Sequence, residues 1–87
     1  MRKIWHDDAW EEYTDWQIKD KKTLKKINNL IKDIDRNRYN GIGKPEALRG
    51  NWTGFYSVCI DEKNRLVFRI SDDVIEIAQC GSHYGDK

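Results

Sequence analysis

The second half of the chain holds three β-rich segments, and the separators between them are very short. The segments are residues 55–60 (FYSVCI), 64–70 (NRLVFRI) and 74–80 (VIEIAQC), separated by DEK and SDD. Three residues are too few for the crossover that parallel neighbours need, so consecutive segments must pair as antiparallel hairpins. Any fold of this chain therefore has to contain a three-stranded meander.

Alternation along the meander predicts its register and its two faces. A loop at residues 62–64 sets Val58 opposite Phe68, and a turn at residues 72–73 sets Phe68 opposite Ile77. These residues share one apolar face, because side chains alternate between the faces of a sheet. By the same alternation the other face carries Ser57, Cys59, Asp61, Arg65, Val67, Arg69, Glu76, Ala78 and Cys80.

The two arginines of this second face have different expected partners. Arg69 falls opposite Glu76, which predicts a cross-strand ion pair. Arg65 falls opposite Cys80, and a guanidinium without a carboxylate partner is available to a phosphate. Cys59 and Cys80 are expected to lie roughly 10 Å apart on strands separated by a third, which is too far for a disulfide.

The first half of the chain carries helical periodicity. Trp10, Tyr13 and Trp16 recur every third residue, and Asp8 with Glu11 fits a capping signature. Residues 21–37 place five aliphatic side chains on one stripe: Leu24, Ile27, Leu30, Ile31 and Ile34. Both stripes predict helices that pack on the apolar sheet face, and RKIW before them is an expected short strand. We therefore expect one α+β domain over residues 1–87, with a small antiparallel sheet of about four to five strands.

Composition excludes several classes of protein. Charged residues make up 36% of the chain, and no apolar run approaches the ~20 residues that span a bilayer. Without an export signal, two cysteines fit a reducing compartment, so we expect a cytoplasmic protein with no membrane partner. Residues 19–38 hold eight basic and three acidic side chains. This block is typical either of a solvated helix face or of a surface that meets a polyanion.

Three groups capable of RNA chemistry are expected on the second face. Glu46 follows Lys44-Pro45 in a Gly-containing connection, Arg65 lies on the middle strand of the meander, and His83 lies near the chain end. A carboxylate can take the proton of a 2′-OH, an arginine can neutralise a phosphate, and a histidine can protonate a leaving oxygen. A metal site is the alternative for other ligand-type residues: His6, Asp7, Asp8 and His83.

Several motifs occur in an order and at spacings that resemble the YoeB/Txe toxins of the RelE superfamily. They are IW…AWEEYTDWQ, KKIN.LIKDI.R, GIGKPE.L, GF.S, NRLVF and a terminal HY. The resemblance implies a RelE-like fold with two N-terminal helices on one face of the sheet. It also implies a ribosome-dependent mRNA endonuclease that needs no cofactor or metal.

The same resemblance implies roles for individual residues and partners. Glu46 resembles the general base, Arg65 the phosphate-stabilising cation, His83 the general acid and Tyr84 the aromatic that completes the site. Arg49, Lys44 and Cys59 occupy substrate-binding positions of the family. The implied partners are a YefM-like antitoxin that covers the site, a second copy in a homodimer, and mRNA on the ribosome. The basic block would then contact rRNA through Lys21, Lys22, Lys25 and Lys26.

Two features depart from the family pattern. Val58 and Cys59 stand where the family usually has two arginines, of which Cys59 replaces the one on the second face, and Gly85-Asp86-Lys87 extends the chain beyond the terminal HY. The missing arginine keeps open a second interpretation, in which the chain binds a ribosome or an antitoxin without cutting RNA. A third interpretation, a gyrase-directed toxin of the ParE type, is disfavoured because it needs no acid–base pair.

Overall fold

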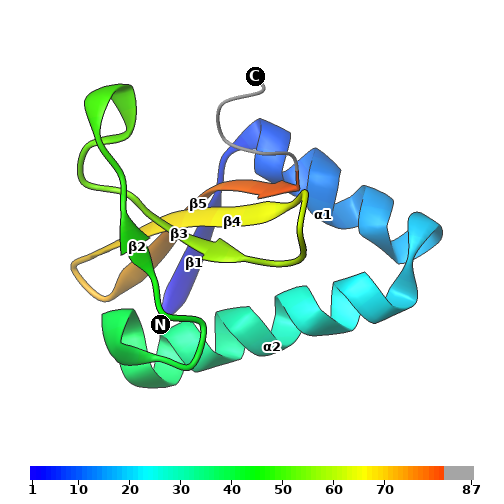
Figure 1. The fold of residues 1–87 in the computed structure, drawn as a ribbon, viewed down its shortest axis with the longest axis horizontal. Helices are drawn as coiled ribbons and strands as arrows, with labels where there is room; N and C mark the ends of the chain where they lie inside the picture. Colours follow the sequence, from blue (N-terminus) through cyan, green and yellow to red (C-terminus); the bar gives the residue numbers. More distant parts are fainter. Residues whose placement is uncertain (82–87) are drawn as a thin grey trace.

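The computed structural model describes residues 1–81, which form two helices beside a five-stranded sheet (Figure 1). The helices are α1 (Asp7–Lys19) and α2 (Lys21–Asn37), and short 3-10 turns occur at η1 (Arg38–Asn40) and η2 (Gly50–Trp52). The strands are β1 (Arg2–Trp5), β2 (Glu46–Ala47), β3 (Tyr56–Cys59), β4 (Arg65–Ser71) and β5 (Val74–Gly81). The predicted α+β fold with two N-terminal helices is confirmed.

The sheet is mixed, with strand order β1-β5-β4-β3-β2. β1 runs parallel to β5, with Arg2 opposite Val74 and Trp5 opposite Ile77, whereas the other three pairs are antiparallel. The sequence predicted an antiparallel sheet, which holds for β2 to β5 only. The intervening helices and strands supply the long connection that a parallel pair requires.

The helices cover one face of the sheet and bury most of the apolar side chains there. The predicted stripe of α2 is confirmed, since Ile27, Leu30, Ile31 and Ile34 are buried. They join buried residues of the meander, from its strands and the start of the β3–β4 loop, in one core: Val58, Ile60, Leu66, Phe68, Ile75, Ile77 and Cys80. The aromatic stripe of α1 is less buried than predicted, because Ala9 takes the central position while Trp10 remains 50% exposed. Neither helix within residues 1–81 is long and apolar enough to cross a membrane.

The two helices begin differently. The Asp20 carboxylate caps α2 by accepting hydrogen bonds from Lys22 N (3.0 Å) and Thr23 N (3.4 Å). The hydrogen bonds from Thr23 hold the pKa of Asp20 below its usual value. The predicted cap at Asp8 is wrong: His6 occupies the N-cap of α1, and its side chain makes no capping hydrogen bond to the helix. Asp8 instead lies in the first turn, where a negative charge favours the helix dipole.

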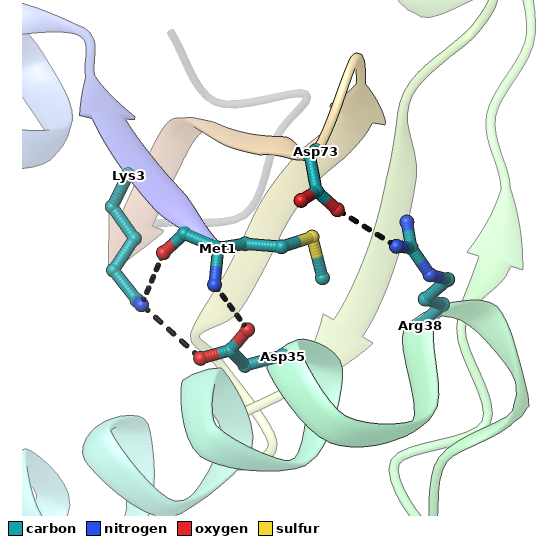
Figure 2. Close-up of polar contacts among 5 residues, drawn as sticks. All are labelled: Met1, Lys3, Asp35, Arg38 and Asp73. Atoms are coloured by element: carbon teal, nitrogen blue, oxygen red, sulfur yellow. Dashed lines mark hydrogen bonds and ion pairs between the residues drawn. The ribbon is translucent and has the colours of Figure 1, made fainter.

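Polar contacts tie the second half of α2 to the sheet (Figure 2). The Met1 ammonium lies 2.8 Å from Asp35 Oδ1, and Lys3 Nζ donates to Asp35 Oδ2 at 3.4 Å. The hydrogen bond from the ammonium is the main reason that the pKa of Asp35 lies below its usual value. At the end of α2, Arg38 Nη2 lies 2.9 Å from Asp73 Oδ1 in the β4–β5 turn.

The β4–β5 register is confirmed as far as Phe68 opposite Ile77, and the turn residues Asp72 and Asp73 both have positive φ angles. Beyond this pair the register shifts by one residue, because Ala78 is left without a direct partner. Such a bulge exchanges the faces of the residues that follow it. Cys80 was predicted on the second face. The bulge places it in the helix-covered core instead.

The β3–β4 register differs from the prediction by two residues. Val58 lies opposite Leu66, not Phe68, and Cys59 lies opposite Arg65. The connection between β3 and β4 therefore spans residues 60–64 and not only the predicted 62–64. The Asp61 carboxylate stabilises this longer loop by accepting hydrogen bonds from the Lys63 and Asn64 amides, both at 2.8 Å. A shift of two keeps every side chain on its predicted face.

Candidate active site on the second sheet face

The second face of the sheet, turned away from the helices, carries a much smaller apolar cluster. Leu48, Val67 and Ala78 are buried there, with Trp52 and Phe55 packed against them. The segment that contains η2 lies on this side, opposite α2 (Figure 1). Part of the face that the sequence predicted to be open is thus covered by its own connection.

Glu46 reaches this face on β2. The strand has only two residues, and Glu46 lies directly opposite Ser57 of β3 with its side chain exposed. Before it, Lys44 has a φ of 50°, and its amide donates to Gly41 O at 3.2 Å. A non-glycine residue in this conformation directly before a proline is unusual, so the approach to Glu46 is a constrained turn. Lys44 and Arg49 are exposed on either side of β2.

Arg65 lies at the start of β4, opposite exposed Cys59 on one side and Gly81 on the other. Its guanidinium makes no hydrogen bond or ion pair with the rest of residues 1–81. Asp61, four residues before Arg65, directs its carboxylate into its own loop, and the hydrogen bond from Asn64 holds its pKa below the usual value. Arg65 therefore remains available to an anion.

Ser57 lies between these two charged residues. Glu46 on β2 lies directly opposite Ser57. On the other side Ser57 pairs with Val67 of β4, so Arg65, two residues before Val67, is its diagonal neighbour. Strand spacing sets the Cα atoms of Glu46 and Arg65 roughly 12 Å apart, a span that two long side chains and a phosphate can bridge. Ser57 itself is 2% exposed, and its hydroxyl has no hydrogen-bond partner in the described part of the chain.

The end of β5 is held by α1. Trp16 Nε1 donates to Cys80 O at 2.8 Å, and the Cys80 amide donates to Glu12 Oε1 at 3.0 Å. Glu12 also lies so close to Gly81 that a Cβ there would meet its carboxylate at 2.8 Å. The strand that leads toward His83 and Tyr84 is thus fixed beside Arg65, while these two residues lie outside the described part of the chain.

A polar cluster lies at the other end of the second face. The predicted pair of Arg69 and Glu76 is confirmed at 2.6 Å, and His6 Nε2 also lies 2.7 Å from Glu76 Oε2. The hydrogen bond from His6, followed by that from Arg69, holds the pKa of Glu76 below its usual value. Arg69 also stacks on Phe55, with Cζ 4.7 Å from the ring centre.

A metal site has no support among residues 1–81, where no three His, Cys, Asp or Glu side chains gather. The His6 ring is engaged by Glu76 instead, with Nε2 2.7 Å from Oε2. The first-turn acids of α1 are explained by helix initiation, and His83 lies beyond the described range.

Comparison with known proteins identifies the family. Residues 5–84 match the family described as YoeB-like toxin of bacterial type II toxin-antitoxin system. The chain belongs to the YoeB family. It is 48% identical over 84 residues to Toxin YoeB of Escherichia coli K12, covering 97% of this chain and all of the relative. It is 43% identical to Toxin YoeB of Streptomyces coelicolor, with the same coverage of both chains.

Solved structures agree with this membership. A YoeB-YefM complex from Staphylococcus aureus contains a chain 46% identical to this one, with a TM-score of 0.89 over 97% of this chain and 98% of the other. A YoeB/ParE toxin from Agrobacterium tumefaciens is 37% identical, with a TM-score of 0.92 over 97% of this chain and all of the other. The predicted resemblance to YoeB toxins is confirmed.

Of the site residues implied by the YoeB resemblance, the structure brings Glu46, Arg65 and Cys59 onto one face. Sequence reasoning overlooked Glu12 and Trp16, which hold the end of β5. Their signal was ambiguous, because both belong to a helix whose other residues pack on the core. Strand alternation placed Ser57 on this face, but the sequence assigned it no role, since a serine in a strand carries no motif of its own.

Proposed function

We propose that this YoeB-family toxin cleaves mRNA on the ribosome by acid–base chemistry without a metal. The observation that carries the proposal is the shared sheet face of Glu46 and Arg65, with the Arg65 guanidinium uncommitted within residues 1–81. The Arg65 guanidinium only donates hydrogen bonds and so suits the phosphate oxygens. The Glu46 carboxylate only accepts them and so suits the 2′-OH beside that phosphate.

In the proposed reaction Glu46 removes the proton from a ribose 2′-OH. The 2′ oxygen attacks the adjacent phosphorus, a new P–O2′ bond forms, and the P–O5′ bond breaks. Arg65 offsets the charge that builds on the phosphate oxygens, and His83 donates a proton to the leaving 5′ oxygen. The products are a 2′,3′-cyclic phosphate and a 5′-hydroxyl. Tyr84 completes the site, and Lys44 and Arg49, beside Glu46, hold flanking phosphates.

The basic face of α2 is the proposed ribosome contact. Four lysines in its first two turns are exposed: Lys21, Lys22, Lys25 and Lys26. Contacts between lysines and rRNA phosphates weaken as salt rises, because salt ions compete for the lysine ammonium groups and for the phosphates. Binding to ribosomes should therefore fall steeply with salt, and less steeply when two of these lysines are replaced by glutamine. An affinity that is flat with salt contradicts this role.

We further propose a YefM-like antitoxin as the cytoplasmic partner and a homodimer as a second assembly. The S. aureus relatives supply the support, since one solved structure is a YoeB-YefM complex and another is a YoeB dimer. This chain also exposes apolar surface suited to a partner, with Ile4 54% and Trp10 50% exposed near the start of α1.

A reconstituted translation reaction tests the proposed function. Wild type should produce defined 5′ ends in ribosome-bound mRNA, whereas Glu46→Ala and His83→Ala should each produce none while retaining the wild-type unfolding midpoint. Glu46 is exposed, so its loss removes little packing. If both variants cut at the wild-type rate, the assignment of base and acid is wrong.

One observation favours a second candidate function, a non-catalytic binder. Cys59 is exposed directly opposite Arg65, so a position that the family fills with a cation faces the proposed phosphate site without one. A protein of this kind would bind ribosomes or antitoxin and leave mRNA intact. Ribosome binding without new 5′ ends, in the same reaction, would favour it over the nuclease.

A further inference from the structure

Ser57 holds a buried hydroxyl that satisfies no hydrogen bond. The residue is 2% exposed, and its Oγ has no partner among residues 1–81. Buried hydroxyls are nearly always paired, because taking one out of water without a partner costs free energy. The side chains of Val67 and Phe55 beside Ser57 are apolar, so an alanine would pack against them without leaving a polar atom buried. Proteins depart from such local consistency at functional sites.

The surroundings of Ser57 identify the group it can serve. Glu46 lies directly opposite on β2, and Arg65 is the diagonal neighbour on β4. Val67 lies opposite on the β4 side, and Phe55 precedes on the same strand face, so neither offers a polar atom from its side chain. An ionised carboxylate only accepts hydrogen bonds and a guanidinium only donates them, whereas a hydroxyl does both.

We propose that Ser57 is a positioning residue for Glu46, and that its hydroxyl donates a hydrogen bond to the Glu46 carboxylate when RNA fills the site. This inference rests on the proposed function. RNA has no access to a residue that is 2% exposed, so Ser57 acts through Glu46. Glu46 is held on a strand of only two residues, and its exposed side chain has many rotamers. A hydrogen bond from the fixed β3 strand selects the rotamer that faces the 2′-OH.

Ser57→Ala separates this role from a structural one. The variant loses a hydroxyl that pairs with no atom of residues 1–81, so its unfolding midpoint should equal or exceed that of wild type. Its single-turnover cleavage rate on ribosome-bound mRNA should fall by about 10-fold to 100-fold, as expected for one hydrogen bond to a charged group. Affinity for ribosomes that carry mRNA with a 2′-deoxy nucleotide at the cleaved position should not change.

Three further variants complete the test. Ser71→Ala removes an exposed hydroxyl at the end of β4 and should cut at the wild-type rate. Ser57→Thr keeps the hydroxyl and should recover most of the lost rate. In a Glu46→Gln background, Ser57→Ala should cause no further loss, because a residue that acts through Glu46 has nothing left to position.

The outcomes distinguish this inference from the function on which it rests. If wild type cuts and Ser57→Ala cuts equally fast, the inference is wrong and the proposed function stands. A lower rate with a matching fall in the unfolding midpoint assigns Ser57 a structural role only and also overturns the inference. If wild type produces no cleavage, the proposed function fails and the inference fails with it.

Discussion

The two faces of the sheet differ in what they bury. The helix-covered face gathers twelve buried residues in one cluster, all apolar, from α1, α2 and three strands. The second face buries three apolar residues and keeps Ser57, Cys59 and Arg65 among them without a described polar partner. Most of the hydrophobic stabilisation therefore comes from the first face. The second face is free to hold groups that reduce stability and serve chemistry.

Charge is also distributed unevenly within the second face. At one end, the carboxylate of Glu76 holds both Arg69 and His6. At the other end, Arg65 faces a cysteine across β3 and a glycine across β5. Of these two ends, as residues 1–81 define them, the Arg65 end is the one that presents an unpaired cation to an incoming anion. The four changes below test this contrast, in order of decreasing expected effect.

Phe68→Ala should cause the largest loss of stability. Phe68 is 0% exposed in the helix-covered core, and the rings of Tyr39 and Tyr56 lie against it. Removing a buried phenylalanine leaves a cavity and should lower the free energy of unfolding by about 3–5 kcal/mol. Urea unfolding measures this loss. A loss below about 1 kcal/mol would show that the second face contributes far more to stability than its small cluster suggests.

Arg65→Gln should have the opposite profile. The side chain makes no hydrogen bond within residues 1–81, so the free energy of unfolding should change by no more than about 0.5 kcal/mol. The cleavage rate should fall by about 100-fold to 1,000-fold, which corresponds to about 2.7–4 kcal/mol of lost charge stabilisation. Single-turnover cleavage and urea unfolding of the same preparation give both numbers. Equal losses in both would mean that Arg65 supports the fold.

Cys59→Arg should increase activity. The new guanidinium would stand on the same face as Arg65, directly opposite it, and would give the phosphate a second cation. We expect about a tenfold faster cleavage, the equivalent of one charge-assisted hydrogen bond at an exposed site. Cys59→Ser is the matched control, since it changes the thiol without adding charge, and should leave the rate unchanged. A slower Cys59→Arg variant would show that two neighbouring cations repel at this position.

Glu76→Gln should have the smallest effect, and that effect should depend on pH. The folded pKa of Glu76 lies below its ordinary value of 4.5, so its stabilisation is fully present above pH 4.5. It is lost as pH falls through the lowered folded pKa. At pH 6 the variant should be about 0.5–1 kcal/mol less stable than wild type, as for other cross-strand ion pairs. Thermal unfolding from pH 6 to pH 2 should show this difference disappear, and a constant difference would contradict it.

The sequence was a good guide where one period governs a long segment. The α2 stripe, the turn at Asp72 and Asp73, and the Arg69–Glu76 pair all follow from periodicity and turn length alone. The faces of β3 and β4 were also predictable, because the register error was an even number of residues. The family resemblance then directed attention to Glu46 and Arg65.

Other features depend on contacts that no short sequence window contains. The bulge at Ala78 moved Cys80 into the core, where Glu12 and Trp16 from α1 bind its backbone. The Asp61 carboxylate reset the β3–β4 loop through two amide hydrogen bonds. The unpaired hydroxyl of Ser57 became visible only when the strands on both sides of β3 were in place. These are tertiary effects, which override local patterns.

The central claim is that the second face makes the 2′-OH of mRNA attack its own phosphate, and the chemistry of the cut ends tests it most directly. Ribosome-bound mRNA should be cut by wild-type protein and the new ends identified by their reactivity toward polynucleotide kinase and ligase. Attack by the 2′-OH should leave a 5′-hydroxyl on the downstream fragment and a 2′,3′-cyclic phosphate on the upstream one. A 5′-phosphate paired with a 3′-hydroxyl would contradict it, because that product requires attack by water.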